Sequence, residues 1–152
     1  MSKIKEVHND LNKIRKGFKI NHILLKNTKN EVIWKSEFDL TVKLNKEELP
    51  GEILECKNVT REINFSSEEE IDSLELVQDF YYNDELIDSS RFSFGFVMPN
   101  SNNCWEQTIE VNPNTNLLMV HDGVKGGNLV AESIFFSKTN IISKNKTILY
   151  YV

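Results

Sequence analysis

The chain has 152 residues, of which 39% are hydrophobic and 27% are charged, and its formal net charge is −5. This length and composition are typical of one globular domain with a substantial core. Because the basic residues are dispersed among acidic ones, the charge disfavours broad nucleic-acid binding and polybasic membrane anchoring.

The N-terminal region lacks the apolar segment of a signal peptide, and no run in the sequence approaches the length of a membrane span. The two cysteines, Cys56 and Cys104, form neither a disulfide framework nor a metal motif. We therefore expect a cytoplasmic protein in a reducing compartment.

Apolar residues recur on one helical face in residues 2–16, at Ile4, Val7, Leu11 and Ile14. This pattern predicts a short amphipathic helix that packs on the rest of the chain and ends at Gly17. A helix that lies on a membrane surface is the alternative, although the apolar stripe is narrow and lacks aromatic residues. The predicted organisation is a packed helix at 1–16 and a single domain at 17–152.

Strand patterns dominate from Phe18 onward. Alternating apolar residues predict strands at 18–26, 31–35, 38–44, 91–100, 102–111, 129–136 and 147–152, whereas LNKEELPG at 44–51 breaks the pattern. Together with two strands between Ile53 and Tyr82, these segments predict eight or nine strands with short turns. We therefore expect an all-β protein that folds as an antiparallel β-sandwich.

The segment from Ile53 to Tyr82 reads as a long hairpin whose acidic tip lies near Glu69. A capping-box pattern of serines followed by glutamates predicts one or two turns of helix at that tip. Each strand carries one polar residue in its apolar row, Arg61 in the first and Gln78 in the second. Because the two would lie roughly opposite each other, the hairpin resembles the polar end of an apolar cavity.

Arg61 also has a structural interpretation. An inward arginine is commonly paired with a nearby carboxylate, or it extends past the sheet edge into solvent. A shift of one residue in the strand register would place both Arg61 and Gln78 on the solvent side.

Catalytic patterns are weak in this sequence. The histidines His8, His22 and His121 lack metal-ligand spacing, and Cys104 has no histidine or acid in motif relation. The pair Gly126–Gly127 is not a phosphate-binding loop. We therefore expect a binding module that uses no cofactor, rather than an enzyme.

Four segments carry a resemblance to a known family: GFKIN at 17–21, ILECKNVTREINFSS at 53–67, RFSFGFVMPNSNNCW at 91–105 and the closing YYV. They resemble the prenyl-binding delta subunit family of rod cyclic-GMP phosphodiesterase (GMP-PDE delta), over about Leu11 to Val152 with one gap near Lys29. FGFVMPNSNNCW is close to that family's FGFV-x-PNS-x-N-x-W, which is quite specific.

The resemblance implies an immunoglobulin-like β-sandwich with a lipid pocket between its sheets. The family takes up the farnesyl or geranylgeranyl group of C-terminally prenylated proteins, solubilises and transports them through the cytosol with transient membrane contact, and releases them when a GTP-loaded Arf-like GTPase binds. Prenylated small GTPases are thus among the expected partners. The alternatives are a carrier of N-myristoylated proteins and a structural phosphodiesterase subunit that does not bind lipid.

The resemblance also implies site residues. Arg61 and Gln78 match positions that hydrogen-bond the prenylcysteine ester, and Asp88 and Ser90 lie near the pocket mouth. The positions that correspond to pocket-lining residues are Ile23, Leu25, Trp34, Leu40, Ile53, Leu54, Cys56, Val59, Ile63, Ile109, Val111, Leu117, Phe135, Leu149 and Tyr151.

The sequence departs from the family at several of these places. Ser90 and Arg91 stand where aromatic residues are common near the mouth, and Asp88 shortens a glutamate. Ala131 replaces a larger aliphatic residue, and Thr147 replaces a valine. These changes affect the expected lipid length, mouth shape and cargo preference.

Overall fold

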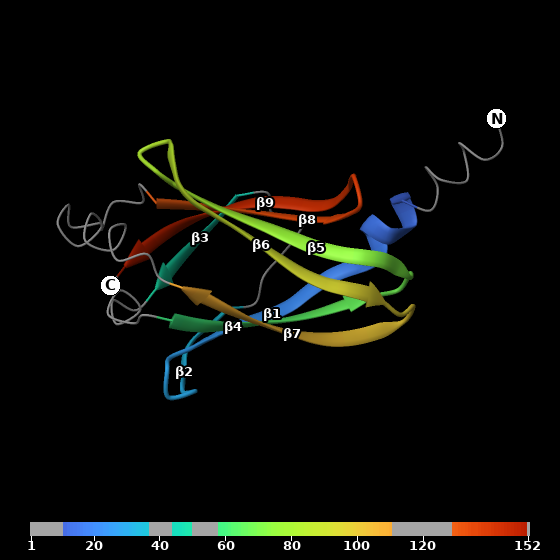
Figure 1. Cartoon of the computed structure of the whole chain (residues 1–152), viewed down its shortest axis with the longest axis horizontal. Coiled ribbons are helices and arrows are strands. Elements are labelled where there is room, and N and C mark those ends of the chain that lie inside the picture. Colours follow the sequence, from blue (N-terminus) through green and yellow to red (C-terminus); the bar gives the residue numbers. More distant parts are fainter. Residues whose placement is uncertain (1–10, 37–43, 50–57, 111–128, 152) are drawn as a thin grey trace.

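The computed structural model describes residues 11–36, 44–49, 58–110 and 129–151, of which 44–49 and 149–151 are described by their backbone alone (Figure 1). This part of the chain forms nine strands: β1 (Phe18–Lys26), β2 (Val32–Ser36), β3 (Leu44–Leu49), β4 (Asn58–Ser67), β5 (Ile71–Tyr82), β6 (Glu85–Val97), β7 (Ser101–Glu110), β8 (Leu129–Ser137) and β9 (Asn140–Tyr151). They build two sheets with the strand orders β2-β1-β4-β7 and β3-β9-β8-β5-β6. The two sheets lie face to face, so the predicted β-sandwich is confirmed.

One strand pair departs from the predicted antiparallel arrangement. β3 runs parallel to β9, while the other pairs are antiparallel. The segment 44–51 was expected to break the strand pattern, but residues 44–49 form β3 at the edge of its sheet. Because an edge strand with charged residues need not show an apolar row, the sequence pattern missed it.

The predicted hairpin between β4 and β5 is wrong. β4 pairs with β1 and β7, whereas β5 pairs with β6 and β8 in the other sheet. The helical tip is also absent, because the backbone of Glu68 is already bonded on both sides. Its N–H donates to the Gly17 oxygen and its oxygen accepts from the Asn100 N–H, each at 3.1 Å. Residues 68–70 therefore carry the chain from one sheet to the other.

Two strand boundaries differ from the predictions. β9 begins at Asn140 rather than at 147, because its first half contains polar residues that hide the alternation. β6 begins at Glu85, since the turn before it comprises only Asn83 and Asp84, both with positive φ (50° and 66°).

Buried apolar side chains form two clusters along the interior. The first cluster contains Phe18, Ile20, Ile63, Phe65, Ile71, Leu74, Leu76, Val97, Trp105, Phe135 and Ile142. The second contains Leu25, Val59, Leu129 and Ala131. The first is the larger and holds the aromatic contacts, so most of the packed core lies at that end of the sandwich.

The N-terminal helix is described only in part. Residues 11–17 are helical, and Ile14 packs against the first cluster. The rest of the predicted helix, residues 2–10, lies outside the described residues. Gly17 joins the helix to β1, where a Cβ atom would lie 2.8 Å from the Glu68 Cβ. That close approach accounts for a glycine at this junction.

Candidate functional site

Five strands contribute side chains to a buried polar layer, which we define as Arg61, Gln78, Gln107, Ser133 and Asn145. Arg61 on β4 lies directly beside Gln107 on β7 in one sheet. In the other sheet, Gln78 on β5 lies beside Ser133 on β8, which in turn lies beside Asn145 on β9. Because directly paired residues point to the same face, each sheet presents its share of the layer to the other sheet.

The guanidinium of Arg61 joins the two sheets. Its Nη1 donates to Gln78 Oε1 in the opposite sheet at 2.6 Å. Its Nε donates to Gln107 Oε1 at 2.7 Å, and its Nη2 donates to the same oxygen. The structure thus brings Arg61 and Gln78 together as predicted, but across the sandwich instead of across a hairpin.

Gln78 is held by further bonds on its own sheet. Its Oε1 also accepts from the Ser133 hydroxyl at 3.1 Å, and its Nε2 donates to the Glu132 backbone oxygen at 3.1 Å. Both amide oxygens that face Arg61 therefore accept two hydrogen bonds each, which uses their two lone pairs.

Arg61 is a buried cation. Only 8% of the residue is exposed, and no carboxylate pairs with it among the described residues. Burial lowers the pKa of Arg61 to about 10, so the guanidinium is still charged at neutral pH. The ring of Phe92 lies 5.4 Å from the guanidinium carbon and adds a cation–π contact. The structural interpretation of Arg61, a partner of a nearby carboxylate, is thus not met in the described part of the chain.

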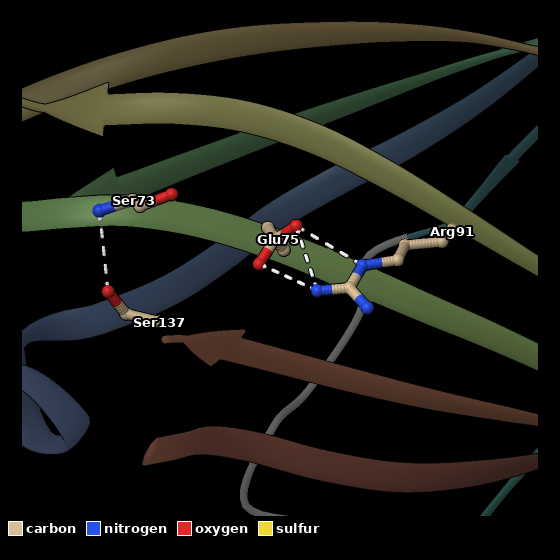
Figure 2. A network of polar contacts seen from close by, with 4 residues as sticks. All are labelled: Ser73, Glu75, Arg91 and Ser137. Carbon is tan, nitrogen blue, oxygen red and sulfur yellow. Dashed lines mark hydrogen bonds and ion pairs between the residues drawn. The ribbon is translucent and has the colours of Figure 1, made fainter. Parts of the chain in front are cut away.

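Arg91 on β6 provides the contrast (Figure 2). Its Nε and Nη2 bind the carboxylate of Glu75 at 3.0–3.2 Å, and its side chain is 61% exposed. Hydrogen bonding to Glu75 raises the pKa of Arg91. It also lies over an aromatic ring, that of Phe136 at 5.0 Å. The two arginines thus differ in burial and in the charge of their partners, and only Arg61 faces the interior.

The polar layer separates the two apolar clusters. Along β4, Val59 of the second cluster precedes Arg61, and Ile63 of the first cluster follows it. Along β5, Leu76 of the first cluster and Phe80, which packs on the second, flank Gln78 in the same way. The layer therefore forms a polar boundary for each cluster.

The two clusters are filled differently. In the first, aromatic rings interlock, with Phe65 at 5.1 Å from Phe94 and Phe18 at 5.3 Å from Phe135. The second has only four buried members, and five large apolar residues pack on it while staying partly exposed, whereas the first has eleven buried members and four such residues. The five on the second cluster are Ile33, Trp34, Phe80, Tyr82 and Ile87. Incompletely covered apolar side chains beside a polar boundary are typical of a ligand site.

The predicted pocket-lining residues fall into four groups. Leu25, Trp34 and Val59 belong to the second cluster, and Ile109 is paired with Val59 on the neighbouring strand. Ile23, Ile63 and Phe135 lie beyond the polar layer, with the first cluster. Leu40, Ile53, Leu54, Cys56, Val111 and Leu117 lie outside the described residues. For the two on β9 only the backbone is described: Leu149 pairs with Leu129 of the second cluster, and Tyr151 with Leu49.

The predicted mouth residues both lie on β6, the edge strand of its sheet. Ser90 pairs directly with Gln78, so it extends the row of the polar layer to the sheet edge. Asp88 pairs with Phe80, and its Oδ1 accepts from the Ser89 N–H at 2.9 Å. Both are partly exposed.

Sequence reasoning missed three members of the layer: Gln107, Ser133 and Asn145. Gln107 is 4% exposed and Asn145 is 3% exposed. Among the described residues, Gln107 Nε2 and both polar atoms of the Asn145 amide have no hydrogen-bond partner. The alternation along β7 could have identified Gln107, because it lies between the inward residues Trp105 and Ile109. Asn145 could not be identified in this way, because the last strand was expected to begin only at residue 147.

The described residues offer neither a metal site nor a membrane-spanning helix. No group of three or more histidine, cysteine, aspartate or glutamate side chains there could hold a metal ion. Within the same residues, no helix is both long and apolar enough to cross a bilayer.

The chain matches the model of a known protein family. The family model of the GMP-PDE delta subunit matches residues 12–151, which is nearly the whole chain. The match includes all nine strands and every residue of the polar layer. The chain therefore belongs to the GMP-PDE delta subunit family.

Proposed function

We propose that this protein is a soluble carrier that binds the farnesyl or geranylgeranyl group of C-terminally prenylated proteins. The family supports a prenyl-binding carrier role in general. The observation that carries the proposal for this chain is the buried Arg61, which is bound by two neutral amides beside an incompletely covered apolar cluster. That combination suits a ligand with a long apolar chain and a small oxygen-bearing head.

The lipid would occupy the second-cluster side of the polar layer. The first cluster is already filled by interlocked aromatic rings, so an isoprenoid chain finds less room there. Leu25, Trp34 and Val59 would line the slot, together with the predicted residues outside the described part of the chain. A farnesyl chain of about fifteen carbons gains on the order of 10 kcal/mol from burial at about 0.8 kcal/mol per methylene-sized group.

The carboxyl end of the prenylcysteine would bind at Arg61 and Gln78. From there, the row of the polar layer leads along Ser90 to the edge strand β6, which provides an exit for the cargo polypeptide. Asp88, on the same edge, would contact the last residues of the cargo. Cargo preference beyond the lipid is therefore expected to depend on Asp88 and Ser90.

Release would require a second partner. We propose a GTP-loaded Arf-like GTPase that binds an exposed sheet edge by strand addition, with the carrier passing cargo between membranes. In the described residues β6 and β7 are such edges, one in each sheet. Linkage requires that cargo weakens GTPase binding as much as the GTPase weakens cargo binding.

Titration with fluorescent lipopeptides tests the proposal. We expect saturable binding of a farnesylated or geranylgeranylated cysteine methyl-ester peptide, and weaker binding of a myristoylated peptide of the same sequence. Preference for the myristoylated peptide would indicate the other class of lipid carrier. Binding of none of the three would reject a lipid-carrier function and favour a purely structural subunit.

A further inference from the structure

Gln107 is oriented by Arg61. A guanidinium only donates hydrogen bonds, so the amide oxygen of Gln107 must face it and the NH₂ group must point away. The structure shows this arrangement, with Oε1 accepting from Arg61 Nε at 2.7 Å and also from Nη2. The direction of the Gln107 NH₂ group is therefore fixed by charge as well as by packing.

That NH₂ group is buried and has no acceptor among the residues that the structure describes. Gln107 is 4% exposed, and its Nε2 lies among the few buried polar atoms without a partner. Arg61 contributes further unused donors, since its three bonds leave two of the five guanidinium N–H groups without an acceptor among the described residues. The oxygens of Gln78 and Gln107 are already saturated, so Arg61 and Gln107 offer donors on their sheet, whereas the unpartnered acceptor of the layer, Asn145 Oδ1, lies on β9 in the other sheet.

We propose that Gln107 is a ligand-contacting residue that determines specificity, and that its Nε2 donates to one oxygen of the prenylcysteine carboxyl group while Arg61 donates to the same group. This inference rests on the proposed function and adds a second point of recognition to it. A buried donor without a partner is costly, and a ligand oxygen relieves that cost only where the two meet. The site therefore selects lipids that carry a carboxyl or carboxyl-ester acceptor on the cysteine α-carbon, and it discriminates against a head that lacks this group.

Two probes that differ only at the head group test this inference. The first is N-acetyl-S-farnesylcysteine methyl ester, and the second is N-acetyl-S-farnesylcysteamine, which has the same lipid and amide but no carboxyl group. Their affinities are measured by displacement of a fluorescent farnesylated peptide from the full chain. We expect the wild-type protein to bind the ester at least tenfold more tightly than the cysteamine.

A double-mutant cycle separates direct contact from positioning. Gln107→Met keeps the length of the side chain without its hydrogen bonds, and we expect about tenfold weaker ester binding with cysteamine binding within twofold of wild type. The same change is then made in the Arg61→Met background. If Gln107 contacts the ligand directly, Gln107→Met weakens ester binding in the Arg61→Met background too. If Gln107 only orients Arg61, Gln107→Met has no effect once Arg61 is replaced.

The outcomes distinguish failure of the proposed carrier function from failure of the proposed role of Gln107. If neither probe binds the wild-type protein saturably, the proposed lipid-carrier function fails and the inference fails with it. If both probes bind equally well, or if Gln107→Met has no effect in the Arg61→Met background, the carrier function stands and the role of Gln107 is overturned. Should Gln107→Met not fold, Gln107→Glu replaces it, because glutamate keeps an acceptor for Arg61 and lacks the N–H; unchanged ester binding would then overturn the role.

Discussion

Replacement of Arg61 by methionine separates binding from stability. Burial lowers the pKa of Arg61 to about 10, and at about 1.36 kcal/mol per pH unit this decrease corresponds to roughly 3 kcal/mol of unfavourable burial. Because the folded-state pKa is the lower one, this penalty is present in full at every pH below about 10 and decreases only above it. Arg61→Met removes the penalty, but it also leaves Gln107 Oε1 without a donor among the described residues, at about 1–3 kcal/mol, whereas Gln78 Oε1 keeps the Ser133 hydroxyl. The terms oppose one another, so we expect an unfolding free energy within about 2 kcal/mol of wild type.

Ligand binding should respond much more strongly to the same change. A hydrogen bond from a charged donor contributes about 1.5–3 kcal/mol, and nothing offsets its loss in the complex. Arg61→Met should therefore weaken binding of a farnesylated methyl-ester peptide by roughly 10- to 100-fold.

Fluorescence titration and urea denaturation measure the two quantities on the same protein. Arg15→Met is the control, because Arg15 is an exposed arginine on the N-terminal helix whose Nε donates to the Ile141 backbone oxygen, outside the polar layer and the predicted mouth. It should leave lipid affinity unchanged. An Arg61→Met protein that is as stable as wild type and binds the ester equally well would refute the assignment of Arg61 to the site.

Three further predictions follow from individual side chains. Asn145→Leu replaces a buried amide without partners by an apolar group of similar size, so it should raise the unfolding free energy by about 1–2 kcal/mol in urea denaturation; a decrease would show that the amide is satisfied in solution. Phe65→Ala removes a fully buried ring of the first cluster and should lower the unfolding free energy by roughly 3–5 kcal/mol in the same assay, and a loss below about 1 kcal/mol would contradict the packing described. Because the pKa of Arg61 is about 10, affinity for N-acetyl-S-farnesylcysteine amide, which has no titrating group of its own in this range, should be constant from about pH 6 to 9 and fall above about pH 10. A similar fall in Arg61→Met would assign it to another group.

Alternation of side chains was enough to predict the sandwich and the inward position of Arg61 and Gln78. It reports which face of a strand a residue occupies, because the period of two is a property of the backbone. Arg61 and Gln78 were therefore assigned to interior rows from their neighbours alone, and the structure places both there.

Alternation does not report which strand a row faces. β4 and β5 were assigned to one hairpin because three residues separate them, although the backbone of Glu68 is bonded to Gly17 and Asn100. Those partners are distant in sequence, and a local pattern does not contain them. Gln107 was missed for the same reason, because its role as a partner of Arg61 follows only from the pairing of β4 with β7. The sequence thus shows which polar residues point inward, whereas the strand pairing decides which of them contact one another.

The composition of the polar layer argues for a binding role over a structural one. A core that served stability alone would be more stable with apolar residues at these positions, because a buried guanidinium without a carboxylate and two amides with unpartnered atoms all lower stability. The unpartnered atom nearest to Arg61 is the Gln107 Nε2 donor, on the amide that Arg61 orients. An oxygen-bearing ligand head at this point would satisfy that donor and the remaining guanidinium N–H groups together. Lipid burial would then supply affinity, and the polar layer would decide which lipids are accepted.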